Sequence, residues 1–307
     1  MNFSFSFSVS LPNLFRNESA ASKFYHAFSI FSRAFATVLS FFEKPIYKRF
    51  RIRYNGVALN PFRQEQEVFI MRIMTCNIWG DYFHNPVKDR MGGYETLFSE
   101  YKPDIVGFQE CTAGWYGSGF FEAIEKDYSL YRLIDKNYTP ILVRKERFSL
   151  LSCGFRLYSR TPDASKGYTY LVLKDNATDK ALGVINTHFW WKVGEEHDRI
   201  REENARELSL CARNIVAAFG CPVYAFGDLN CRYHESPFRI LASEGFSCAI
   251  DSAREADKMS SHHGDPVLGE DGRWHGRKTE NDKNHSLDHI LFMNGTESIF
   301  RYRVVCD

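Results

Sequence analysis

The stretch PVYAFGDLN, residues 222–230, joins a hydrophobic run to a polar end. The apolar run predicts a buried strand, and Asp228 and Asn230 stand where that strand gives way to a turn. The preceding segment, 195–219, is charged on one side and apolar on the other, which predicts an amphipathic helix. Its apolar positions are Ile200, Leu208, Cys211, Ile215 and Phe219. A long helix followed by a buried strand indicates an α/β protein.

The same arrangement recurs along the chain, with a polar side chain placed where a hydrophobic run meets a turn. The runs are RIMTCNIW (72–79), DIVGFQE (104–110), ALGVINTHFWW (181–191) and SLDHILF (286–292). In layered α/β folds, sites are assembled from strand ends that a rigid sheet brings together. The polar side chains at these ends are Asn77, Gln109, Glu110, Asn186, His188 and Asp288.

The segments between these runs complete the expected architecture. Residues 87–101, 113–126 and 235–244 are predicted to be helices, and DNATDK (175–180) is typical of a hairpin turn. Residues 246–250 and 302–306 are predicted strands, and 252–284 a polar loop. Strand pairs are more numerous than a purely parallel sheet would give. We therefore predict an α/β fold, a four-layered α/β sandwich of two mixed β-sheets flanked by helices.

The charge of the chain is unevenly distributed. Residues 1–70 carry nine basic and four acidic side chains, which leaves 30 basic and 34 acidic ones for residues 71–307. A protein that binds long nucleic acid through its phosphates usually has a basic surface. The acidic excess of the body weakens the case for nucleic acid without excluding it, because a basic rim can surround an acidic metal site.

The eight cysteines are widely spaced, include no CxxC pair, and several lie in apolar runs. This pattern predicts reduced core thiols in a cytoplasmic protein. Cys76, Cys111 and Cys231 each neighbour a candidate site residue. Because adjacent side chains of a strand point to opposite faces, we expect these thiols to face the core and not the site.

Residues 1–70 form a separate compositional unit ahead of a main domain at 71–307. Eleven of the 27 phenylalanines lie in the first fifty positions, and residues 24–42 carry an apolar stripe with helical spacing. Three interpretations remain: a helix lying on a membrane, a helix docked on the main domain, or a leader or non-native segment upstream of Met71. The leader is favoured slightly, because the first strand of the body begins almost at Met71.

Carboxylate and amide oxygens from several strands make a site that suits Mg²⁺ or Mn²⁺. Such a site indicates hydrolysis of a phosphate ester. Plainer alternatives exist for single residues: Asn77 is typical of a turn, Glu110 of a helix cap, and His188 of a buried histidine bonded to the backbone. The polar loop holds His262, His263, His275 and His285, whose spacing favours a solvated loop over a zinc site.

The blocks MTCNIW, GFQE, INTHF and GDLN, in this order, resemble the signature blocks of the endonuclease/exonuclease/phosphatase superfamily. The resemblance covers residues 71–307 and implies a divalent-metal-dependent hydrolase of phosphate esters. Its substrate would be nucleic acid, a phospholipid or a small phosphorylated molecule, and no protein partner is inferred. The four blocks identify the family and leave the substrate open.

The resemblance also implies a role for each matching residue. Glu110 would bind the divalent cation, with Asn77 helping to orient it. Asp228 would orient or activate the attacking water, and Asn230 would hydrogen-bond to the scissile phosphate. His188 would contact the phosphate or supply a proton toward the leaving oxygen.

Asp288 matches a further block, in which the acid supports a later catalytic histidine. In the family that histidine follows on another strand, opened by a Ser-Asp-His block that residues 289–307 do not contain. By resemblance, we expect the chain to stop one strand short. His289 is not the missing histidine, because its side chain should point to the other face of its strand.

Three functions follow from these observations. The first is a metal-dependent phosphodiesterase, nuclease or phosphatase that uses metal-activated water. The second is a catalytically impaired, truncated relative that only binds phosphorylated ligands. The third is a membrane-associated phospholipid phosphodiesterase that makes weak membrane contact through residues 24–42.

Overall fold

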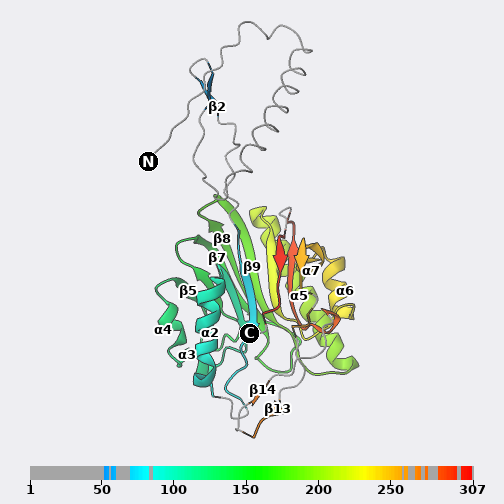
Figure 1. Ribbon diagram of the computed structural model, residues 1–307. Coiled ribbons are helices and arrows are strands. Elements are labelled where there is room, and N and C mark those ends of the chain that lie inside the picture. The colour runs from blue at the N-terminus through cyan, green and yellow to red at the C-terminus, as the bar shows by residue number, and fades with distance from the viewer. Residues whose placement is uncertain are drawn as a thin grey trace, which may run out of the picture. The chain divides into compact units, whose positions relative to one another are not determined.

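The computed structural model describes residues 52–54, 57–59, 70–82, 86–257, 259–261, 267–270, 274–275, 283–295 and 299–305 (Figure 1). The chain divides into two units, Met1–Val68 and Phe69–Asp307. In the first unit, β1 (Ile52–Tyr54) pairs antiparallel with β2 (Val57–Leu59). The helix expected over residues 24–42 lies outside the described residues, as do His262 and His263 of the polar loop.

One sheet of the second unit has four strands in the order β3-β4-β6-β5. Strand β3 (Ile73–Asn77) runs parallel to β4 (Ile105–Gln109), so their carboxyl ends lie side by side. Strand β6 (Ile141–Arg144) pairs antiparallel with both β4 and β5 (Tyr128–Tyr131). The sheet is therefore mixed, and the polar ends of β3 and β4 meet at one edge.

The other large sheet has six strands in the order β11-β15-β10-β9-β8-β7. The DNATDK turn joins β8 and β9 as an antiparallel hairpin, and β10 runs parallel to β9. On the far side of β10, β15 is antiparallel to both of its neighbours. The strands are β7 (Phe148–Leu157), β8 (Gly167–Asp175), β9 (Lys180–His188), β10 (Val223–Asp228), β11 (Ser247–Cys248) and β15 (Asp288–Met293).

Helices cover the outer face of each sheet (Figure 1). The four-stranded sheet packs against α2 (Lys88–Tyr101), α3 (Ala113–Tyr116) and α4 (Phe120–Ile124), through aromatic side chains that include Phe98, Phe108 and Trp115. The six-stranded sheet packs against α5 (Glu195–Phe219), and α6 (Ser236–Ser243) packs against α5 and adds Leu241 to the same buried cluster. The predicted α/β architecture of two mixed sheets flanked by helices is confirmed.

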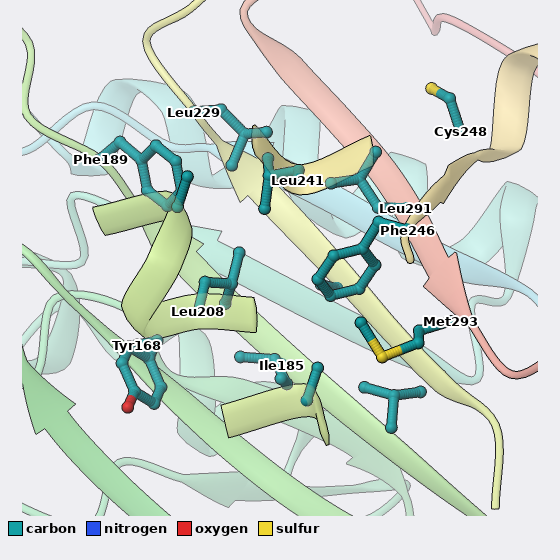
Figure 2. Packing of buried hydrophobic residues seen from close by; sticks show 14 of the residues in the cluster. Tyr168, Ile185, Phe189, Leu208, Leu229, Leu241, Phe246, Cys248, Leu291 and Met293 are labelled. Atoms are coloured by element: carbon teal, nitrogen blue, oxygen red, sulfur yellow. The ribbon is translucent and has the colours of Figure 1, made fainter. Parts of the chain in front are cut away.

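Two apolar layers hold the six-stranded sheet in place. On its outer face, Ile185, Leu208, Leu241 and Met293 belong to one buried cluster (Figure 2). On its inner face, a second cluster joins the two sheets; its buried members are Ile105, Ile141, Val143, Phe148, Leu171, Leu173, Leu182, Val184 and Phe226. Burying apolar area of this kind is worth about 25 cal/mol per Å², which makes these layers the main source of stability.

Helix α5 is amphipathic, as predicted, but its apolar face is not made of the expected residues alone. Leu208 and Ile215 are buried together with Ala205 and Ala212, whereas Phe219 at the end of the helix is 42% exposed. The small alanines allow close approach to the sheet, and Phe219 lies in the last turn, beyond the packed part.

Among the residues that the structure describes, no helix is both long enough and apolar enough to cross a membrane.

Three predicted elements differ from the structure. The helix expected over 113–126 is broken into α3 and α4, because Gly119 between them has φ +90°, which ends a right-handed helix. The strand expected over 246–250 is limited to β11 and continues as the short helix α7 (Ala249–Ser252). The strand expected over 302–306 is limited to β16 (Arg301–Tyr302), which pairs with β12 (Glu255–Ala256).

The polar segment 252–284 also contains some regular structure. Besides β12 it holds β13 (Val267–Leu268) and β14 (Trp274–His275), which form a short antiparallel pair. A single turn of 3₁₀ helix, Lys283–His285, leads into β15. The expectation of an unbroken loop was therefore wrong at these short pairs.

Candidate active site

Strand register brings Asp228, His188 and Asp288 to the same end of adjacent strands in the six-stranded sheet. Asp228, at the end of β10, is the register partner of His188 on β9. It is also the register partner of Asp288, the first residue of β15. In the four-stranded sheet, Asn77 ends β3 and Glu110 directly follows β4. Side chains separated by more than a hundred positions in the sequence therefore meet at one site.

Asn77 links the two sheets through its side chain. Its amide nitrogen donates to Glu110 Oε1 at 3.1 Å and to Asp228 Oδ2 at 3.0 Å. Its amide oxygen accepts the backbone N–H of Trp79 at 3.0 Å, which fixes the direction of the amide. One neutral side chain thus holds two carboxylates close together without neutralising them.

Asp228 is buried and fully engaged. Its Oδ2 accepts from Asn77, and its Oδ1 accepts the backbone N–H of Asn230 at 2.9 Å. Burial raises the pKa of this carboxyl; the two hydrogen bonds and the Lys166 charge oppose that rise. The fold therefore keeps Asp228 basic for a carboxylate and fixed in direction.

Asp288 lies beside Asp228 and is less well satisfied. Burial and the Asp228 carboxylate raise the pKa of Asp288 to about 8, and a hydrogen bond with Ser261 opposes the rise. Its Oδ1 is buried and has no hydrogen-bond partner among the described residues. A buried carboxylate oxygen without a donor is costly, and a cation is one of the groups that would satisfy it.

His188 faces both Asp228 and a residue that the sequence did not indicate, Lys166. His188 Nε2 lies 3.6 Å from Asp228 Oδ2, and Lys166 Nζ lies 3.0 Å from Nε2 and 3.1 Å from Nδ1. Both side chains are buried. Nothing in the sequence marks Lys166, since a lysine just before a strand is ordinarily solvated.

The sequence also gave no signal for Tyr82, which lies close enough to Glu110 for the two groups to interact. Burial together with the Glu110 carboxylate raises the pKa of Tyr82 to about 12.

Asn230 supports the site through the backbone. Its amide nitrogen donates to the carbonyl of Phe189 at 3.1 Å, while its own N–H is bonded to Asp228. Its φ of +45° is left-handed, a conformation that asparagine tolerates well. Glu110 has φ +58°, also left-handed and less usual for a glutamate, and such strain occurs often at functional sites. The predicted contact of Asn230 with the scissile phosphate stays a prediction.

The glycine of GDLN has a strict steric role. Gly227 has φ +146°, and a Cβ placed there would lie 1.9 Å from the carbonyl oxygen of Thr187 on the neighbouring strand. Only glycine permits this approach of β10 to β9. Gly227 therefore fixes the register that places Asp228 opposite His188.

Gln109 and Asn186, although they stand at strand ends, belong to the interior. Gln109 Nε2 donates to Asn186 Oδ1 at 2.6 Å, and Asn186 Nδ2 donates to the carbonyls of Phe108 at 2.7 Å and Pro140 at 2.9 Å. Both side chains are completely buried. They join the four-stranded sheet to the six-stranded sheet just beneath the site and are not available to a ligand.

Neighbouring residues face away from the site, as predicted. His289 is buried and its Nε2 lies 3.0 Å from the carbonyl oxygen of Cys231, on the other face of β15 from Asp288. Cys111 and Cys231 are buried in the core, and Cys76 packs partly against it, with its Sγ 3.6 Å from the hydroxyl of Tyr94. Burial raises the pKa of all three thiols. They are not placed to bind a metal.

The two tryptophans after His188 differ in environment. Trp190 is buried and its indole N–H donates to His197 Nδ1 at 3.0 Å, whereas Trp191 is 56% exposed. Trp190 therefore covers the core. Trp191 remains available at the surface, with Lys192 Nζ 5.7 Å from the centre of its ring.

The chain matches the Endonuclease/Exonuclease/phosphatase family over residues 74–306, and it therefore belongs to this family. The resemblance seen in the four sequence blocks is confirmed, and membership supports phosphoester hydrolysis as the class of reaction. A search of curated protein sequences gave no match.

Several solved structures share the fold. A mannosyl-6-phosphatase from Bacteroides thetaiotaomicron is 18% identical, with a TM-score of 0.62 over 78% of this chain and 90% of that chain. A truncated TDP2 from Caenorhabditis elegans is 20% identical, with a TM-score of 0.56 over 75% and 86%. The human Nocturnin catalytic domain with bound sulfate is 18% identical, with a TM-score of 0.54 over 73% and 82%. At these identities the likeness shows the fold alone.

Proposed function

We propose that this protein hydrolyses phosphate esters with the help of Mg²⁺ or Mn²⁺. The observation that carries the proposal is the bridge from Asn77 to Glu110 and Asp228, at 3.1 and 3.0 Å, with Asp288 on the adjacent strand. It holds one carboxylate from each sheet on the same amide. Carboxylates collected in this way favour binding of a hard cation.

The residues fit a cation that keeps part of its water shell. No group of three or more His, Cys, Asp and Glu side chains in the described part of the chain lies close enough to hold a metal alone. Mg²⁺ does not need one, because it is usually bound by one or two carboxylates, waters and substrate phosphate oxygens. Glu110, oriented by Asn77, would hold it, and the unpartnered Asp288 Oδ1 adds an acceptor. When bound, the ion would supply charge stabilisation for the phosphoryl oxygens.

The side chains of this protein supply the remaining chemistry. Asp228 would take the proton of the attacking water, since burial makes it a better base than an exposed carboxylate. Its direction is fixed by the bonds from Asn77 and from the N–H of Asn230. His188 and Lys166 would bind the phosphate side of the site, where two donors offset the negative charge of the transition state.

Membership of the family leaves several classes of phosphate ester as candidate substrates. Nucleic acid, a phospholipid and a small phosphorylated molecule all present the same phosphate group. The mannosyl-6-phosphatase neighbour makes a sugar phosphate a suitable first choice for a substrate panel.

We also propose a cytoplasmic location, supported by the free thiols of the seven described cysteines. Membrane association through residues 24–42 is the alternative. Fractionation of cells that express the full chain would decide between them, since a membrane-bound pool that salt does not release contradicts the first.

The function is tested by hydrolysis of an aryl phosphomonoester, an aryl phosphodiester, mannose 6-phosphate and plasmid DNA, with Mg²⁺, Mn²⁺ or EDTA. We expect at least one substrate to be cleaved with metal and none with EDTA. Asp228→Asn should lower that rate about 10²- to 10⁴-fold. Asp135→Asn, an exposed aspartate distant in sequence from every site residue, is the matched control and should leave the rate unchanged.

Activity that persists in EDTA, or in Asp228→Asn, would contradict the proposal. A folded protein that cleaves none of these substrates would support the second function considered above, binding of phosphorylated ligands without turnover.

A further inference from the structure

The loop that follows β3 supplies backbone donors to two candidate site residues. The N–H of Trp79 donates to Asn77 Oδ1 at 3.0 Å. The N–H of Gly80 donates to Glu110 Oε2 at 3.4 Å, while the other oxygen of this carboxylate accepts from Asn77. The direction of the loop backbone therefore sets the orientation of the pair that would hold the cation.

The carbonyl groups of the same loop converge on one side chain, Arg90, in the first turn of α2. Arg90 Nη1 donates to the carbonyl oxygens of Ile78 and Trp79, the second at 2.6 Å. Its Nη2 donates to the carbonyl oxygen of Gly80 at 3.3 Å. Because a guanidinium presents its donors in a rigid planar fork, it fixes the directions of successive carbonyls relative to one another.

Arg90 holds the very peptide groups that donate to the site. The carbonyl of one residue and the N–H of the next share a planar unit, and in a trans peptide they point in opposite directions. The unit between Ile78 and Trp79 has Arg90 at its carbonyl end and Asn77 at its N–H end. The next unit has Arg90 at its carbonyl end and Glu110 at its N–H end. The guanidinium is thus one peptide group away from each of the two site residues.

The backbone at Trp79 needs such support. Its φ of +48° is left-handed, which is unusual for a bulky residue and persists only where the surroundings hold it. Its carbonyl oxygen also accepts the indole N–H of Trp115 at 3.0 Å. Trp115 is completely buried, and the guanidinium carbon of Arg90 lies 5.1 Å from the centre of its ring. The core therefore fixes Arg90 and the loop against the same indole.

We propose that Arg90 is a positioning residue for the cation site, which fixes the two peptide groups that orient Asn77 and Glu110. The inference rests on the proposed function for the cation and on these hydrogen bonds for the loop. A direct effect of the Arg90 charge would have the opposite sign. The guanidinium lies close enough to Glu110 for their charges to interact, and a positive charge there disfavours a bound cation. The direction of the change when Arg90 is removed separates positioning from charge.

Mn²⁺ binding to the full chain, followed by electron paramagnetic resonance, tests the inference in variants whose folding is checked by circular dichroism. Arg90→Met should weaken binding about tenfold or more, as loss of an outer contact of a metal site usually does. Arg90→Lys should bind with intermediate affinity, because lysine keeps the charge but lacks the fork. Lys88→Met removes an exposed positive charge from the start of the same helix and should bind like the parent. Unchanged or tighter binding in folded Arg90→Met would overturn the inference. Should Arg90→Met fail to fold, binding by Arg90→Lys equal to that of the parent would overturn it.

The effect on the loop is measured without metal, by amide hydrogen exchange in EDTA of a peptide that contains residues 77–82. We expect slow exchange in the parent and in Lys88→Met, and exchange at least about tenfold faster in Arg90→Met. Equal exchange in Arg90→Met and the parent would overturn the inference. If the parent binds no Mn²⁺, the proposed function fails, and hydrogen exchange still decides whether Arg90 holds these peptide groups.

Discussion

At the scale of single residues, the site depends on one amide that two carboxylates share. Asn77 bonds to Glu110 and Asp228, and its bond lowers the pKa of Asp228 against the effect of burial. The sequence indicated all three residues from their places at strand ends. It did not indicate that Asn77 would be the link, because the link depends on how the two sheets are stacked.

Replacing Asn77 should therefore change the pH dependence of the reaction. In Asn77→Ala the charged form of Asp228 loses a donor, so its pKa should rise further. A base with a higher pKa is protonated at higher pH, and the acid limb of kcat/KM should move to higher pH. The rate at its maximum should fall about 10- to 100-fold. Thr96→Ala, an exposed position on α2, serves as the control. An acid limb that stays in place would show that Asn77 does not act on Asp228.

Asp288 gives the metal-free protein a characteristic dependence of stability on pH. Its pKa of about 8 in the folded state lies above the ordinary value of 3.8. Between these values the folded state binds more protons than the unfolded state, so the free energy of unfolding falls as pH rises. Urea unfolding in EDTA should show this fall from pH 4 to pH 8, and Asp288→Asn should reduce it. A slope that Asp288→Asn leaves unchanged would contradict this account.

Lys166 shows the limit of sequence reasoning at this scale. Asn77, Glu110, His188, Asp228 and Asp288 follow a rule that a single chain reveals, a polar residue at the end of an apolar run. Lys166 instead enters from the loop after β7 and is recognised only by its burial and its contact with His188. Gln109 and Asn186 follow the rule but bond to each other inside the molecule. The rule locates the edge of a sheet and does not distinguish an interior residue from a ligand.

At the scale of elements, a glycine fixes the strand that carries Asp228. Gly227→Ala requires an unfavourable backbone and a Cβ 1.9 Å from Thr187 O, so it should destabilise the fold by about 3 kcal/mol or more. Gly92→Ala, in α2 with open space around it, should instead stabilise by about 0.5–1 kcal/mol. Urea unfolding of both variants checks the pair. Equal effects of the two substitutions would show that Gly227 has no special role.

Most elements of the fold were predictable because each has one dominant pattern. The apolar runs named above contain β3, β4, β9, β10 and β15, and the segment 195–219, charged on one side, forms α5. The failures occurred where a local pattern competed with backbone geometry. Gly119 divides a segment whose side chains suit a helix, and residues 249 and 250, predicted as the end of a strand, begin α7. Tertiary context, which the sequence does not display, decided these cases.

At the scale of the main unit, a buried ion network ties the two sheets together. Arg147 bonds to Asp104, just before β4, at 2.8 Å and to Asp175, the last residue of β8, at 3.1 Å. These carboxylates are almost fully buried, so removal of the Arg147 cation leaves Asp175 without its ionic partner and Asp104 with Arg144 alone, at 3.6 Å. Arg147→Met should destabilise the fold by about 3–5 kcal/mol. The midpoint of urea unfolding measures this, and Arg199→Met, in an exposed pair with Glu195, should change it little. Similar midpoints for the two variants would contradict the role of the network.

The layered arrangement of the whole unit is what makes one site from distant segments. The sequence was sufficient to predict the family, because its four signature blocks occur in order and each contains the polar end of a strand. The substrate could not be predicted, since the candidate site residues would act on the phosphate group, which many esters share, and the fold does not determine the loops that select a substrate.

We propose that Glu110, oriented by Asn77, holds a cation beside the base Asp228 and that this site supports hydrolysis. The most direct measurement is Mn²⁺ binding to the full chain by electron paramagnetic resonance, for the parent, Glu110→Gln and Glu122→Gln, an exposed position on α4. We predict one Mn²⁺ site in the parent and in Glu122→Gln, weakened at least about tenfold in Glu110→Gln, with hydrolysis falling in parallel. Equal binding by Glu110→Gln and the parent would contradict the account.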